Sequence, residues 1–132
     1  MLVNIDVPDL KQAVAFYTQA FGLEVRRRFG QGGAELTGWP APVWLLEKAA
    51  GTVAAPGCPR IYERHWTPVH LDIIVEDMDD ALSRAVSAGA RVEREVRVEV
   101  WGKIVGLADP FGHGLCLIEF LNRGYDEIAA AG

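Results

Sequence analysis

Three side chains of this sequence could bind a metal ion or move a proton. Glu47 and Glu119 each end an apolar run that carries a single carboxylate, and His70 opens the second half of the chain. Carboxylates and imidazoles act as general acids and bases and as ligands of divalent cations. A single Glu at a strand end is also commonly solvated, and a single His is commonly structural. Their function therefore depends on which elements position them.

The two halves of the chain repeat one pattern at an offset of 68 residues, as in Val7 and Val75 or Asp9 and Asp77. Repeats of this kind indicate a folding unit that occurs twice. Apolar periodicity and turn residues predict a strand, a helix and three further strands in each half. The expected helices begin at Asp9 and Asp77 and end at Gly22 and Gly89, and the expected strands are 2–7, 23–29, 34–37, 43–48, 70–75, 91–98, 103–108 and 115–120.

These elements predict an α+β fold built from two tandem βαβββ modules. The modules span about 1–48 and 69–120, and a breaker-rich linker over 49–68 joins them into one domain, followed by a tail over 121–132 that ends in a short helix. A single helix covers only one face of each sheet. We therefore expect the two modules to form a cup-shaped mixed sheet with the helices outside.

Composition excludes several classes of partner. The 132 residues carry a net charge of −5, which disfavours nucleic acid because phosphate binding requires a clustered positive surface. No apolar run approaches the roughly 20 residues needed to span a bilayer, and no signal peptide is visible at the start. We expect a cytoplasmic protein with no nucleic-acid or membrane partner. Of the two cysteines, we expect Cys116 to be a small buried hydrophobic residue.

Strand alternation predicts which side chains face the cup. Side chains two and four residues before Glu47 and Glu119 share the face of these carboxylates; they are Leu45, Val43, Leu117 and Leu115. The alternate residues, among them Trp44 and Cys116, then lie under the helices. Carboxylates in such a pocket lose hydration at a cost of several kcal/mol each unless they are neutralised. A divalent cation would remove this cost; otherwise protons or an Arg must do so. The expected cup residues are Glu47, Glu119, Asp72, Asp6, Asn4 and His70.

Several motifs resemble one superfamily. They are Ile5-Asp6-Val7-Pro8-Asp9-Leu10, Phe21-Gly22-Leu23, His70-Leu71-Asp72, and Asp109-Pro110-Phe111-Gly112 before Ile118-Glu119. The chain resembles the vicinal oxygen chelate superfamily, which includes glyoxalase I, extradiol dioxygenases, methylmalonyl-CoA epimerase and the bleomycin and fosfomycin resistance proteins. The resemblance implies the fold over nearly the whole chain, whereas the superfamily hosts many chemistries.

The resemblance also implies a metal site. Carried over position by position, the metal ligands are His70, Glu119 and Glu47, and the fourth ligand position falls on Leu2, which cannot bind a metal. Asn4 is an alternative on the same strand face. The implied cofactor is a divalent ion (Ni, Zn, Mn, Fe or Mg), or none. Glu119 or Glu47 would be the catalytic base.

Two functions agree with these residues. The first is a glyoxalase-like, metal-dependent lyase or isomerase that transfers a proton on a small oxygen-chelating substrate. The second is a non-catalytic protein of the bleomycin-resistance type that binds a small molecule or antibiotic in a Trp-lined groove. The resemblance implies a homodimer. The cup could form within one chain or across a swapped dimer.

Overall fold

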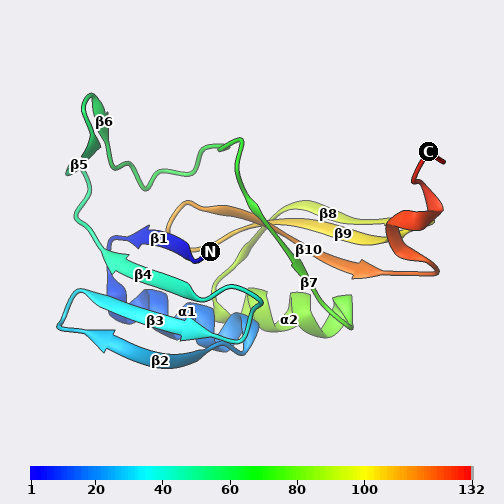
Figure 1. Cartoon of the computed structure of the whole chain (residues 1–132), viewed down its shortest axis with the longest axis horizontal. Coiled ribbons are helices and arrows are strands. Elements are labelled where there is room, and N and C mark those ends of the chain that lie inside the picture. Colours follow the sequence, from blue (N-terminus) through cyan, green and yellow to red (C-terminus); the bar gives the residue numbers. More distant parts are fainter. Residues whose placement is uncertain (132) are drawn as a thin grey trace. The chain divides into compact units, whose positions relative to one another are not determined.

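Two βαβββ units form the fold in the computed structural model, which describes residues 1–131 (Figure 1). They comprise residues 1–63 and the chain from Arg64 onward. Each contains a four-stranded mixed sheet and one long helix. The predicted α+β class and the repeated module are therefore confirmed.

The first unit contains a sheet with the strand order β1-β4-β3-β2. β1 pairs with β4 in parallel, and the other neighbours are antiparallel. A short β5–β6 hairpin follows, within the segment that the sequence predicted to be a plain linker. The elements are β1 (Val3–Val7), α1 (Leu10–Phe21), β2 (Glu24–Phe29), β3 (Gly33–Thr37), β4 (Val43–Glu47), β5 (Val53–Ala55) and β6 (Cys58–Pro59).

The second unit repeats this topology, with the strand order β7-β10-β9-β8. β7 pairs with β10 in parallel, as β1 does with β4. The tail adds a short 3-10 helix, η1 (Gly124–Glu127), as expected. The other elements are β7 (Leu71–Ile74), α2 (Met78–Ala88), β8 (Arg91–Glu99), β9 (Gly102–Ala108) and β10 (Gly114–Phe120).

Side-chain caps define where both helices begin. The Asp9 carboxylate accepts a hydrogen bond from the backbone N–H of Gln12 at 2.8 Å, and Asp77 accepts from Asp80 at 2.9 Å. These bonds satisfy N–H groups that have no partner inside the helix. α1 ends at Gly22, whose φ of 68° is a left-handed conformation that glycine adopts without strain.

Each helix packs on its own sheet through an apolar stripe. Leu10, Ala13, Phe16, Tyr17 and Ala20 are the buried residues of α1, and Met78, Ala81 and Ala85 are those of α2. The central strands β4 and β10 supply the facing side chains, including the fully buried Leu45 and Leu117. No helix among residues 1–131 is long and apolar enough to cross a membrane.

The cap of α2 gives a prediction about stability. Replacing Asp77 with Ala removes the bond to the N–H of Asp80 and should lower the free energy of unfolding by about 1 kcal/mol, measured by urea denaturation. Asp79→Ala is the control, because it removes the same charge from the first turn without removing a cap bond. Equal losses in the two variants would contradict the assigned cap.

Candidate metal and ligand site of the second unit

A row of directly paired residues crosses all four strands of the second sheet. Arg94 on β8 is paired with Gly106 on β9, Gly106 is paired with Cys116 on β10, and Cys116 is paired with Asp72 on β7. Directly opposed residues of neighbouring strands point to the same face of a sheet. His70 lies two residues before Asp72 and thus beside the same face. The sheet topology, rather than proximity in sequence, brings these groups together.

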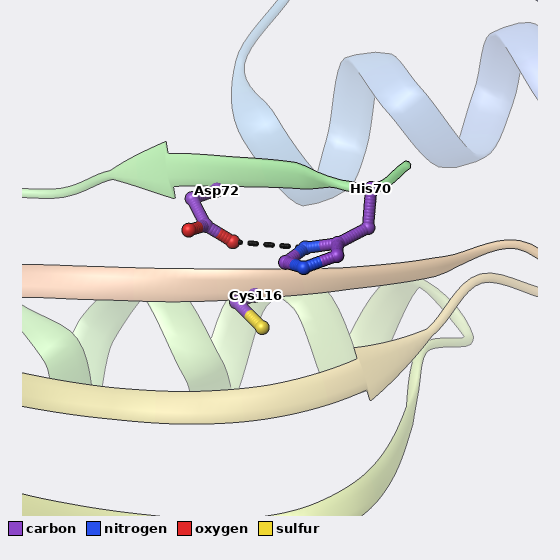
Figure 2. Close-up of side chains that lie close together, drawn as sticks. All are labelled: His70, Asp72 and Cys116. Atoms are coloured by element: carbon purple, nitrogen blue, oxygen red, sulfur yellow. Dashed lines mark ion pairs between the residues drawn. The ribbon is translucent and has the colours of Figure 1, made fainter. Parts of the chain in front are cut away.

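His70, Asp72 and Cys116 form a compact cluster of potential metal ligands (Figure 2). Their ligand atoms all lie within 4.8 Å of one another. His70 Nδ1 lies 3.1 Å from an Asp72 carboxylate oxygen. The two atoms are close, yet this buried nitrogen has no hydrogen-bond partner among the described residues, so their relative direction is unsuitable for one. A cation at the cluster would supply the missing interaction.

The surroundings of Cys116 hold its thiol in the neutral form when no metal is present. Burial raises the pKa of Cys116, and the negative charge of Asp72 raises it further, while the positive charge of Arg94 acts in the opposite direction. The ring of His70 contacts Trp66, with the ring centroids 4.9 Å apart. The cluster is thus partly enclosed and bordered by an aromatic side chain.

Gly106 makes room for Arg94 to reach the cluster. A Cβ atom at position 106 would lie 2.9 Å from Nε of Arg94, so a larger residue there would displace the guanidinium group. With glycine in place, Arg94 lies across β9, and its Nη2 approaches the Sγ of Cys116 at 3.9 Å. The guanidinium group therefore borders the three potential ligands directly.

A cavity of about 470 Å³ adjoins Arg94. Arg64 is one of its lining residues, and the Arg64 guanidinium forms a forked ion pair with Glu93 at 2.8–3.0 Å. This hydrogen bond with Arg64 holds the pKa of Glu93 below its usual value. The volume suits a small organic molecule. The lining residues are Arg64, His65, Trp66, Glu93, Arg94, Gly106, Leu107 and Leu115.

Glu47 and Glu119 are bound to helix N-termini. In the first unit, Glu47 Oε2 accepts from the N–H of Leu10 at 2.8 Å, and in the second, Glu119 Oε2 accepts from the N–H of Met78 at 2.7 Å. Lys103 Nζ also lies 3.3 Å from that Glu119 oxygen. Carboxylates are stabilised at these positions because the N–H groups and the helix dipole favour negative charge.

The face assignment made from the sequence is therefore wrong for both β4 and β10: Glu47 and Glu119 lie on the helix side, and Trp44 and Cys116 on the opposite face. Cys116 and Glu119 are three residues apart in a strand whose pairing with β9 is continuous, so they point to opposite faces. Glu119 contacts the start of α2, whereas Cys116 joins His70 and Asp72. The predicted ligand and base roles of Glu119 and Glu47 are separate from this correction and stay predictions.

The remaining predicted cup residues are in the first unit. Asn4 is exposed, and so is Leu2, the residue at the implied fourth ligand position. The carboxylate of Asp6 forms an ion pair with Arg60 at 2.6 Å, so it is neutralised by an Arg, the alternative that the sequence left open. Trp44 stacks on Phe29 with the ring centroids 4.5 Å apart. The first unit thus has an aromatic side chain, Trp44, at the place where the second unit has the potential metal ligand Cys116.

Sequence comparison identifies the family. A profile of the glyoxalase-like domain matches residues 2–118, which is most of the chain. The chain belongs to the glyoxalase-like domain family. An uncharacterized protein of Mycobacterium bovis is 40% identical over 67 residues, which are 49% of this chain and 44% of the relative. This glyoxalase-like chain thus covers less than half the length of that curated relative.

Solved structures share the glyoxalase-like fold. A lactoylglutathione lyase from Agrobacterium tumefaciens superposes with a TM-score of 0.64 at 20% identity, covering 90% of this chain and 91% of the lyase. A point mutant of the fosfomycin resistance protein FosX from Listeria monocytogenes gives a TM-score of 0.71 at 18% identity, covering 97% and 95%. That FosX structure holds Mn(II) and 1S,2S-dihydroxypropylphosphonic acid. At these identities the similarity establishes the fold.

Sequence reasoning expected His70 and Asp72 in the pocket but missed Cys116 and Arg94. Cys116 lies in an apolar run that is buried on both faces, so alternation of polarity could not show which face meets the helix, and counting from Glu119 assigned Cys116 to the wrong one. Arg94 lies in a charged edge strand where every Arg appears equally solvated. The available signal was Gly106, a residue that weakens a strand and often marks close approach by another group.

The position of Glu119 predicts the behaviour of a variant. Glu119→Ala removes the acceptor for the N–H of Met78 and should lower the free energy of unfolding by about 1–2 kcal/mol in urea denaturation. Because Glu119 points away from His70, the affinity for Zn²⁺ in calorimetric titration should not change. Glu95→Ala, at an exposed position on β8, is the control for loss of charge. A lower Zn²⁺ affinity in Glu119→Ala alone would support the predicted ligand role instead.

Proposed function

We propose that this glyoxalase-like domain is a metal-dependent enzyme of the lyase or isomerase type, acting on a small oxygen-chelating substrate. The supporting observation is the cluster of His70, Asp72 and Cys116, with ligand atoms within 4.8 Å of one another. Family membership agrees with this proposal, since the structurally similar FosX crystal contains Mn(II) and a small organic ligand.

The donor set fits a divalent transition metal ion. It offers one imidazole nitrogen, one carboxylate oxygen and one sulfur, a combination that suits Zn²⁺, Fe²⁺, Co²⁺ or Ni²⁺ better than Mg²⁺. The buried Nδ1 of His70, which has no hydrogen-bond partner within residues 1–131, supports the same conclusion. Three protein ligands leave at least one coordination position for water or substrate, as in catalytic zinc sites.

Different residues of the chain would bind the metal ion, bind the substrate and transfer the proton in such an enzyme. When bound, the metal ion would supply Lewis-acid polarisation of substrate oxygens. His70, Asp72 and Cys116 would hold it, and the adjoining cavity of about 470 Å³ would hold the organic part of the substrate. The proton-carrier role of Glu119 or Glu47 stays a prediction; each carboxylate accepts a helix N–H group, and Glu119 lies on the face of β10 opposite Cys116.

A non-catalytic small-molecule binding protein is the second candidate. The observation that favours it is the exposed indole of Trp66 at the cavity, which has a guanidinium carbon about 6 Å from its ring centre on both Arg64 and Arg94. Such an aromatic platform binds planar ligands without a metal. The predicted homodimer would serve either function, and light scattering would measure it.

Cobalt binding separates the two candidates. Co²⁺ added to the purified protein should produce a thiolate-to-cobalt absorption band in the near ultraviolet, because Cys116 would ligate as the thiolate. His70→Ala and Cys116→Ser should each weaken binding about tenfold or more. Cys58→Ser is the control, because Cys58 is the other, exposed cysteine. If wild-type protein binds neither Co²⁺ nor Zn²⁺ and still folds, the enzyme proposal fails and the binding protein is favoured.

A further inference from the structure

The first unit provides an internal reference for the second, because both contain the same strand order. In the first sheet, β2, β3, β4 and β1 place Arg27, Glu35, Trp44 and Asn4 in one row. Arg27 forms an ion pair with Glu35 at 2.7 Å, and the Glu35 side chain is only 1% exposed. The positive charge in this row is therefore neutralised by the neighbouring strand.

The corresponding row of the second unit contains the same type of cation without that acid. Arg94 occupies the place of Arg27, and Gly106 occupies the place of Glu35. Within residues 1–131, no carboxylate lies at ion-pair distance from Arg94, whose close contacts are the Cys116 sulfur and the Trp66 ring. The replacement of an acidic residue by glycine thus leaves a guanidinium group available on this face.

The other charged groups at the cavity do not compensate Arg94. Glu93 is the acidic residue in the lining, and the forked ion pair with Arg64 engages both of its carboxylate oxygens. Arg64 and Glu93 cancel each other, so Arg94 lines the cavity as a cation with no ion-pair partner within residues 1–131. An anionic ligand group would find an available guanidinium fork there, the geometry that binds carboxylates most specifically.

We infer that Arg94 binds the anionic group of a small carboxylic acid whose apolar or aromatic part lies against Trp66. The distance of 3.9 Å between Arg94 and the Cys116 sulfur places such a carboxylate beside the candidate metal ligands. A second oxygen on the neighbouring carbon would then lie toward the cluster, so 2-hydroxy and 2-oxo carboxylic acids are the substrate class. The description of this ligand as a substrate rests on the proposed function, whereas the anion site itself does not.

Mandelate and mandelamide form a suitable pair of probes, because mandelate carries a charged carboxylate where mandelamide carries a neutral amide and the two are otherwise the same. Binding of each is measured by Trp fluorescence and calorimetry, both in metal-free protein and with Zn²⁺ added. Wild-type protein should prefer mandelate by about tenfold or more, the effect of one charge-assisted hydrogen bond. Arg94→Gln should abolish the preference, and Arg94→Lys, which keeps the charge but not the fork, should restore part of it.

Arg97→Gln is the matched control, because Arg97 lies on the same strand and is paired with Glu99 at 2.8 Å. It should retain the preference for mandelate. Equal binding of the two probes by wild-type protein, or an unchanged preference in Arg94→Gln, would overturn the inference. Failure of the proposed function is distinguishable: the protein would then bind no metal, while the preference for mandelate and its dependence on Arg94 would persist in the metal-free protein.

Discussion

The parallel pairing of β7 with β10 is the constraint on which the candidate site depends. It places Asp72 directly opposite Cys116, and antiparallel pairing with β9 then continues the row to Gly106. A shift of one residue in either pairing would turn Cys116 or its neighbours to the other face. The compact ligand cluster and the position of Arg94 both follow from this alignment.

The two carboxylates that end β4 and β10 contribute to the structure on the other side of the same strands. Each binds the first turn of the helix that follows β1 or β7, in addition to the Asp cap at the helix start. In the second unit, this anchor holds α2 against the sheet from which Cys116 projects. The repeated anchor explains why a Glu occurs at matching places in both halves.

The sequence predicted the fold well, because the apolar periodicity and the capping residues that define each helix and strand lie within that element. Asp9, Asp77 and Gly22 begin and end helices as expected, and the strands lie within one or two residues of their predicted bounds. The candidate site was harder to predict from the sequence. Which face of a strand meets a helix is a tertiary property, and the run around Cys116 is apolar on both faces. The available charge of Arg94 became evident only from the glycine opposite it and from comparison with the Arg27–Glu35 pair.

X-ray absorption at the zinc K-edge of Zn²⁺-loaded protein tests the central claim most directly, since it reports the atoms bound to the ion. Ligation by His70, Asp72 and Cys116 predicts one sulfur scatterer at about 2.3 Å, with the remaining ligands nitrogen or oxygen at about 2.0–2.2 Å. The sulfur contribution should disappear in Cys116→Ser. A first shell of nitrogen and oxygen alone in the wild-type protein would contradict the assigned site.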